Sequence, residues 1–415
     1  MSRVLMLIII ASVLVLLDVY IFQSVRYVFP QDSATKRTVT IVYWLISAVA
    51  LGSFFYYNLS DKTMMSRELR TFLFAIIFVN YASKFFGVLI LIIDDVVRLG
   101  QWAWMKLRPT EPAPSASTDG ISRSDFLVKT SLVATALPAL AMTYGIVSGA
   151  HDYRVRRVKV PLKNLPPSFD GLRIGQLSDI HSGSFYNKTA VQGGVDLLLQ
   201  EKPDVVFFTG DLVNNQATEI KDYFPIFSQV KAPLGVFSTL GNHDYGDYIE
   251  WPSPQAKQQN LEMVKAAHRQ MGWDLLLDEH RMLREGNGTL AIIGIENWGA
   301  GRFAKYGNLA KAHRGTEEAD AKLLLSHDPS HWDAQVRPSY PDIDLALAGH
   351  THGMQFGVEV GDFKWSPVQY MYRQWAGLYQ DGEQFLYVNR GYGFLAFPGR
   401  IGMPPEITIL ELTRA

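Results

Sequence analysis

The sequence predicts a protein of two parts: a bundle of about four transmembrane helices, followed by an α/β or α+β sandwich in which sheet is flanked by helices. The first 150 residues contain four long apolar runs. From residue 151 to residue 415, short apolar runs typical of strands alternate with helical patterns. The length of 415 residues also exceeds one ordinary domain. We therefore divide the chain into a transmembrane region, 1–150, and a globular domain, 151–415.

The overall composition excludes several classes of site. The chain has 39 basic and 40 acidic residues, for a net charge of −1, so it lacks the basic surface that nucleic-acid binding requires. We expect no nucleic-acid partner. The chain has no cysteine, which excludes disulfides, thiolate metal sites and a cysteine nucleophile.

The four apolar runs are long enough to span a bilayer. Each has about 19–23 residues, which as a helix crosses the roughly 30 Å of hydrocarbon. The alternative is four buried helices of a soluble domain. Asp18 and Lys84 interrupt two of the runs. Such residues can have a function inside a span, but more often they lie near a membrane interface or at a contact between helices. The expected spans are 4–22, 38–57, 71–93 and 126–147, with a flexible linker at 109–120 that is rich in Pro, Ser and Thr.

Basic residues beside the spans indicate the topology. Cytoplasmic loops are enriched in Lys and Arg. More of these residues follow the first and third spans than precede the first or follow the second. We therefore expect a multi-pass protein of the cell (inner) membrane whose globular domain lies outside the cytoplasm. The residues that follow the first and third spans are Arg26, Lys36, Arg37, Arg98, Lys106, Arg108 and Arg123, against Arg3, Lys62, Arg67 and Arg70.

The globular domain shows a regular alternation of elements. An edge strand is expected at 154–160, where polar and apolar residues alternate. Further strands are expected at 172–177, 291–295, 384–388 and 406–412, and helices at 188–199, 223–230 and 258–271. The pattern indicates a sheet covered by helices.

Five apolar runs of this domain end in side chains that bind metals. Ligands in open α/β sheets bind at the carboxyl ends of strands, so these side chains should meet at one rim. Seven oxygen and nitrogen ligands are too many for one ion and suit two, and a carboxylate such as Asp211 can bridge them. Without thiolates, the two divalent ions are Mn, Fe or Zn. The seven candidates are Asp179, His181, Asp211, Asn242, His327, His350 and His352.

Together these motifs resemble the full signature of the calcineurin-like metallophosphoesterases, in the order of that family. The resemblance implies a four-layer sandwich with two central sheets and helices outside, and hydrolysis of a phosphate ester by metal-bound hydroxide. It implies that His243 stabilises or protonates the leaving oxygen and that Asp244 orients the imidazole. It also implies a first ion on Asp179, His181, Asp211 and His352, and a second on Asp211, Asn242, His327 and His350.

The C-terminal part resembles the membrane-associated bacterial members of that family, in the segments 387–393 and 404–410. Arg390, in the first segment, could reach the phosphate. An insertion at 363–375 mixes aromatic and basic residues, among them Trp365, Tyr370 and Arg373. It could line a substrate cleft, enter a membrane surface or simply pack as a surface loop.

The sequence is compatible with cleavage of more than one kind of bond. A phosphodiester, a pyrophosphate or a phosphomonoester all suit such a centre, and a lipid-linked ester would explain the membrane spans. One alternative is a pyrophosphatase of the UDP-2,3-diacylglucosamine type, from lipid A synthesis. Another is an inactive membrane scaffold or a sensor that has kept the fold.

Overall fold

The computed structural model describes residues 2–29, 33–61, 64–107, 123–301, 303–361 and 363–415. It divides into two compact units, a helical unit (Met1–Tyr144) and a globular unit (Gly145–Ala415). The linker expected at 109–120 lies outside the described residues. The helical unit contains α1 (Arg3–Val28), α2 (Ala34–Leu59), α3 (Arg67–Leu107) and most of α4 (Arg123–Val147).

All four helices are long and apolar enough to cross a membrane, and each expected span lies within one of them. The prediction of four apolar helices is thus confirmed. The 41 residues of α3 exceed the expected span at 71–93. At 1.5 Å per residue this helix is about 60 Å long, twice the thickness of the hydrocarbon layer.

The two ionisable residues within the spans pair with one another. Lys84 Nζ lies 2.5 Å from Asp18 Oδ1, and both groups are buried. Ser47 Oγ bonds both, at 2.9 Å from Lys84 and 3.0 Å from Asp18. A charged side chain in hydrocarbon is costly unless it is paired, which explains why α1, α2 and α3 meet at these residues.

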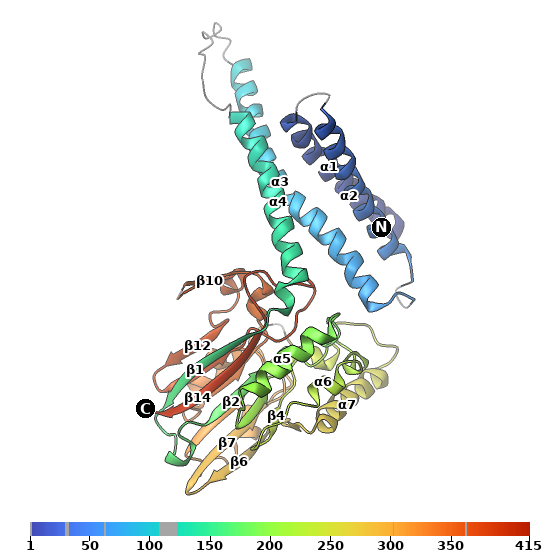
Figure 1. Ribbon diagram of the computed structural model, residues 1–415. Helices are drawn as coiled ribbons and strands as arrows, with labels where there is room; N and C mark the ends of the chain where they lie inside the picture. The colour runs from blue at the N-terminus through green and yellow to red at the C-terminus, as the bar shows by residue number, and fades with distance from the viewer. Residues whose placement is uncertain (1, 30–32, 62–63, 108–122, 302, 362) are drawn as a thin grey trace. The chain divides into compact units, whose positions relative to one another are not determined.

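The globular unit is built on two six-stranded mixed sheets (Figure 1). The first has the order β1-β14-β2-β3-β4-β5, with β1 (Arg154–Leu162) at the edge as expected. Its other strands are β14 (Glu406–Arg414), β2 (Arg173–Leu177), β3 (Val205–Phe208), β4 (Val236–Ser238) and β5 (Asp274–Leu275). The second has the order β12 (Gly377–Asp381), β13 (Gln384–Val388), β9 (Leu345–Ala348), β8 (Ala321–Leu325), β7 (Gly288–Gly294) and β6 (Glu279–Glu285). A separate hairpin pairs β10 (Val358–Val360) with β11 (Phe363–Trp365).

Alternation along the strands produces four layers. In β3, Val205 and Phe207 lie in the core between the sheets, whereas Val206 and Phe208 lie in the core beneath the helices on the outer face. A third apolar core lies on the outer face of the second sheet, under α8 and the segment 332–343. Each fully buried aromatic or aliphatic side chain contributes roughly 1.5–3 kcal/mol, so both faces of each sheet stabilise the unit. The predicted sandwich of two sheets between helices is confirmed.

Helices cover the outer faces. They are α5 (Lys188–Gln200), α6 (Phe224–Phe227), α7 (Pro254–Met271), α8 (Leu309–His313) and α9 (Arg337–Ser339). The helix expected at 223–230 is only one turn long. Short 3₁₀ segments are η1 (Gly149–His151), η2 (Pro167–Phe169), η3 (Ala217–Ile220), η4 (Asn242–Tyr245), η6 (His352–Gln355) and η7 (Pro367–Tyr370), and η5 (Trp332–Val336) is a π-helical turn.

Candidate metal centre

The seven side chains expected to bind metals follow the carboxyl ends of five strands. Asp179 and His181 follow β2, Asp211 follows β3 and Asn242 follows β4 in the first sheet. His327 follows β8, and His350 and His352 follow β9, in the second sheet. Strands β2, β3 and β4 are parallel, and so are β8 and β9, so each sheet delivers its ligands at one end. The side chains form two clusters, Asp179 with His181 and His352, and Asp211 with His327 and His350.

Five of these residues have left-handed backbone conformations, which are rare for residues other than glycine. Each such conformation costs on the order of 1–3 kcal/mol and persists where the surroundings impose it. Backbone bonds impose it here: Asp179 N–H donates to Gly210 O at 2.9 Å, and His181 N–H donates to Asp211 O at 3.0 Å. The φ angles are 51° at Asp179, 47° at His181, 61° at Asp211, 69° at His350 and 51° at His352.

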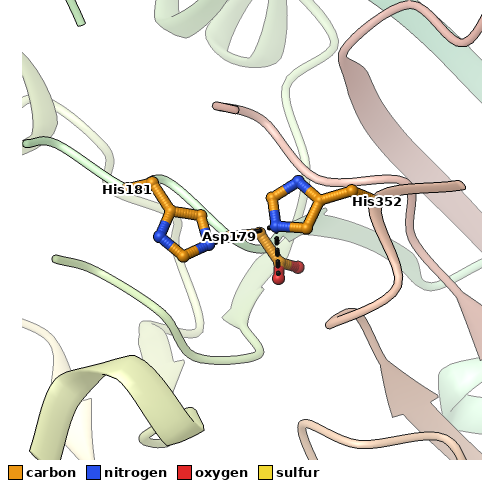
Figure 2. Close-up of side chains that lie close together, drawn as sticks. All are labelled: Asp179, His181 and His352. Carbon is orange, nitrogen blue, oxygen red and sulfur yellow. Dashed lines mark hydrogen bonds and ion pairs between the residues drawn. The ribbon is translucent and has the colours of Figure 1, made fainter. Parts of the chain in front are cut away.

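The first cluster is drawn in Figure 2. His352 Nε2 lies 3.3 Å from Asp179 Oδ1 and 3.0 Å from His181 Nε2. The other ring nitrogen of His181, Nδ1, lies 3.1 Å from Asn214 Oδ1, an acceptor. His181 therefore carries its proton on Nδ1 and turns the lone pair of Nε2 towards the cluster.

The second cluster contains two acceptors that face each other. His327 Nδ1 donates to Thr209 O at 2.7 Å, which leaves Nε2 unprotonated in the neutral ring. That nitrogen is buried, has no hydrogen-bond partner among the described residues, and lies 3.1 Å from Asp211 Oδ2. In the neutral ring, the lone pair of Nε2 and the carboxylate repel each other at this distance, so a positive charge belongs between them, either a proton on Nε2 or a metal ion. The arrangement fits a bound cation.

Asn242 offers a free oxygen to the same cluster. Its Nδ2 donates to the hydroxyl of Tyr248 at 2.8 Å, which fixes the orientation of the amide. Its Oδ1 is buried and has no hydrogen-bond partner in the described part of the chain. A buried amide oxygen without a donor is costly, and a metal ion would satisfy it.

The buried carboxylates of the two clusters stabilise positive charge on the groups around them. Burial alone would lower the pKa of His327, but Asp211 and Asp179 outweigh it and raise this pKa to about 10, so without a metal Nε2 holds a proton that faces Asp211. A bound cation would take the place of that proton. Burial opposes ionisation of Asp179, yet His352 and His327 hold its pKa well below the usual range. Two buried carboxylates among these imidazoles form a site that a divalent cation neutralises well.

His243 lines the same cavity but is oriented differently from the expectation. Its Nδ1 donates to the backbone oxygen of Asn214 at 2.8 Å, so this carbonyl holds the ring. The hydrogen-bond partner of this imidazole is thus Asn214, whereas Asp244 was expected to orient it. Asp244 accepts backbone N–H bonds from Asp211 (2.9 Å), Leu212 (2.9 Å), Val213 (3.2 Å) and Gly241 (2.9 Å). It thus joins the loops that carry Asp211 and Asn242.

The four side chains expected to contact substrate do not line the cavity next to the metal ligands. Arg390 is buried, and its guanidinium lies 2.6 Å from Glu406 and 3.1 Å from Glu359. Trp365 is half-buried, whereas Tyr370 and Arg373 are exposed. The cavity has a volume of about 220 Å³ and is lined by His181, Asp211, Asn242, His243, Tyr248, Phe303, His350, His352 and Leu395.

Three residues at the site were not among those expected. Asn214 holds both His181 and His243, and its position three residues after Asp211 was the available signal. The Tyr372 hydroxyl bonds His350 Nε2 at 2.8 Å, so part of the aromatic insertion does reach the centre. Phe303 packs edge-on against His350, and no sequence pattern distinguishes it.

Both units of the chain are similar to known protein families. Residues 2–150 match the family described as "Probable Calcineurin-like phosphoesterase, transmembrane domain", and residues 172–354 match "Calcineurin-like phosphoesterase". A zebrafish (Danio rerio) protein named "Transmembrane protein with metallophosphoesterase domain" is 31% identical over 294 residues, covering 68% of this chain and 63% of the relative. This chain therefore spans less than two thirds of that relative.

Two further proteins extend the comparison. The Escherichia coli protein named "Phosphodiesterase YaeI" is 28% identical over 240 residues, which cover 57% of this chain and 80% of the relative. Among solved structures, the sulfate thiohydrolase SoxB of Thermus thermophilus aligns with a TM-score of 0.33 and 13% identity, covering 60% of this chain and 57% of SoxB.

Proposed function

Since this chain belongs to the calcineurin-like phosphoesterases that carry an N-terminal transmembrane domain, we propose that it is a membrane-anchored, metal-dependent hydrolase of phosphate esters. The observation that carries the proposal is the buried contact between His327 Nε2 and Asp211 Oδ2, 3.1 Å apart, beside the Oδ1 of Asn242, which is unpartnered within the described ranges. Asp211 Oδ2 also lies 3.5 Å from His181 Nε2, within reach of both clusters. We assign one ion to Asp179, His181, Asp211 and His352, and a second to Asp211, Asn242, His327 and His350.

Two divalent cations at these positions would lower the pKa of a water between them and offset the charge of a phosphate group. The side chains of this protein would hold the two cations and protonate the leaving oxygen. Because the Nδ1 proton of His243 is committed to the Asn214 carbonyl, Nε2 is the atom that can deliver a proton to the leaving oxygen. Tyr248 and Phe303 form walls of the cavity and limit the water around the ester.

The substrate class follows from the membrane domain and from the cavity lining. A water-soluble ester would not require four membrane crossings, whereas a phosphate ester on a lipid would. Phe303, Leu395 and Tyr248 add apolar surface beside the ligands. A relative named as a phosphodiesterase favours a phosphodiester over a phosphomonoester or a pyrophosphate. We place the protein in the inner membrane with its globular unit outside the cytoplasm, from the distribution of basic residues.

The test is a hydrolysis assay on the full-length chain, purified in detergent, stripped of metal and reloaded separately with Mn, Fe or Zn. The panel holds a lipid phosphodiester, a lipid phosphomonoester and a nucleotide-linked lipid pyrophosphate, each beside a short-chain soluble analogue. We expect metal-dependent release from a lipid ester, and Asp211→Asn should lose hydrolysis and bound metal together. Two ions per chain with normal turnover in that variant would contradict the assignment of the bridge.

A further inference from the structure

The β10–β11 hairpin presents one charged and one apolar face. Its register pairs Val358 with Trp365 and Val360 with Phe363, so these four side chains share a face. The pair between them, Glu359 and Lys364, lies on the other face. The strands are short and have no further strand beside them.

The charged face anchors the hairpin to the globular unit. Glu359 binds Arg156 through two hydrogen bonds, of 2.9 Å and 2.6 Å, and binds Arg390 at 3.1 Å. Lys364 Nζ donates to Ala376 O and to the hydroxyl of Tyr379. The hairpin is therefore held in one orientation, and its apolar face is turned away from these partners.

That apolar face is exposed. Val360 is 70% exposed and Phe363 is 61% exposed, and Phe356 and Val358 are also accessible. The turn that follows β11 adds Tyr370, 78% exposed, and Met371, 70% exposed. Isolated apolar side chains are common on surfaces, but a continuous group of this kind marks an interaction surface. We call Phe356, Val358, Val360, Phe363, Tyr370 and Met371 the apolar hairpin face.

Contacts within the globular unit connect this face to the end of the last membrane span. The apolar helical segment continues through Gly145 to His151. Gly145 O accepts a hydrogen bond from Arg400 N at 3.1 Å, and a side chain at Gly149 would collide with Arg400 O. The next residue, Ile401, pairs with Phe356 at the base of the hairpin and accepts from Gly357 N at 2.9 Å.

We propose that the apolar hairpin face docks into the surface of the bilayer. The last candidate span runs to His151, so a surface bonded to Gly145 and Gly149 is expected to lie close to the lipid. Aromatic and aliphatic side chains on a rigid hairpin suit the boundary between head groups and acyl chains. We therefore expect the bilayer, and not a second copy or a protein partner, to cover this face.

Docking there would also orient the metal centre, and this consequence rests on the proposed function. Ser366, directly after β11, donates to Gly353 O at 2.8 Å, next to His352. Thr351, between the two ligands of this loop, donates to Trp375 O at 2.7 Å. The hairpin and the ligand loop are thus one bonded assembly, so a lipid-borne phosphate would approach the centre from the docked side.

The absence of cysteine allows a direct test. Single cysteines replace Val360, Phe363 or Asn287, and each is labelled with an environment-sensitive dye on the full-length chain. Asn287, exposed in the turn between β6 and β7, is the matched control. The labels of β6 and β7 lie at the opposite end of the globular unit from that of β10 (Figure 1). The chain is reconstituted in phosphatidylcholine vesicles with and without a nitroxide-labelled lipid. We expect blue-shifted emission and nitroxide quenching at positions 360 and 363, and neither at 287.

Two outcomes would overturn the proposal. Emission at 360 and 363 that matches position 287 would mean that the face is in water. A blue shift that nitroxide lipid does not quench, and that grows with protein density, would assign the face to a second copy.

Activity gives a second, separate measurement. Phe363→Glu should lower turnover of a vesicle-borne phosphate ester by roughly ten-fold, since it removes an apolar contact with lipid, and should spare a soluble ester. Equal turnover of the vesicle-borne ester by Phe363→Glu and the unmodified chain would count against docking. If the unmodified chain hydrolyses neither ester, the proposed function fails while the labelling result still decides whether the face docks.

Discussion

Replacing Asp244 by asparagine distinguishes two possible roles of this residue, holding the loop that carries Asp211 and orienting His243. Each oxygen of its carboxylate accepts two backbone N–H bonds: Oδ1 from Leu212 and Val213, and Oδ2 from Asp211 and Gly241. An amide group keeps one oxygen and turns the other position into a donor. Two buried N–H groups then lose their acceptor.

The cost follows from that count. A buried donor without an acceptor costs about 1–3 kcal/mol, so two cost roughly 2–6 kcal/mol of the free energy of unfolding. For a unit of this size, that corresponds to a fall in Tm of roughly 5–20 °C. The loop that carries Asp211 should shift as well, so bound metal should fall together with stability.

The assay combines thermal unfolding, followed by tryptophan fluorescence, with elemental analysis of the purified full-length variant. Asp196→Asn is the matched control, the same chemical change at an exposed residue of α5 whose carboxylate accepts a bond from Gln192 that an amide oxygen can also accept. We expect the control to stay within about 0.5 kcal/mol of the unmodified chain. If Asp244→Asn kept its Tm and both metals and lost only rate, Asp244 would act on His243 instead, and the structural interpretation would be refuted.

Four further predictions concern His243, Arg390, Glu406 and Lys202. His243→Ala should keep its metal and its Tm but lose about two to four orders of magnitude in rate, as expected for a proton donor; loss of metal would make it a ligand. Arg390→Met should cost roughly 3–5 kcal/mol because it leaves Glu406 buried without its nearest partner, and should leave KM for a soluble ester unchanged; a raised KM in a stable variant would restore its role in substrate binding. Although burial opposes it, Arg390 and Arg156 lower the pKa of Glu406, so this stabilisation is present above the pKa of the unfolded chain and should fade in acid as the folded carboxylate is protonated. A cysteine introduced at Lys202 should react with an impermeant reagent in intact cells or spheroplasts; labelling only after lysis would place the globular unit in the cytoplasm.

The sequence determined the elements and most of the ligands, because both leave local signals. Four apolar runs were sufficient to predict four helices, and the alternation of polar and apolar residues at 154–160 was sufficient to predict the edge strand β1. The candidate ligands were recognisable because each follows a strand at its carboxyl end, where parallel strands bring side chains to one rim. The boundaries moved in α3 and α6, and some elements were not predicted, among them α8 and the β10–β11 hairpin.

Only the tertiary structure decided what each polar side chain binds, because its partners come from distant parts of the chain. Asp244 is adjacent to His243 in sequence but bonds the loop after β3, and Asn214 holds the imidazole instead. Arg390 is turned inward by Glu406, and the aromatic insertion is divided between Tyr372 at the metal centre, Trp375 in the core and Tyr370 in solvent. Strand periodicity specifies the face on which a side chain lies, whereas its hydrogen bonds depend on which loops the two sheets bring together at their common rim.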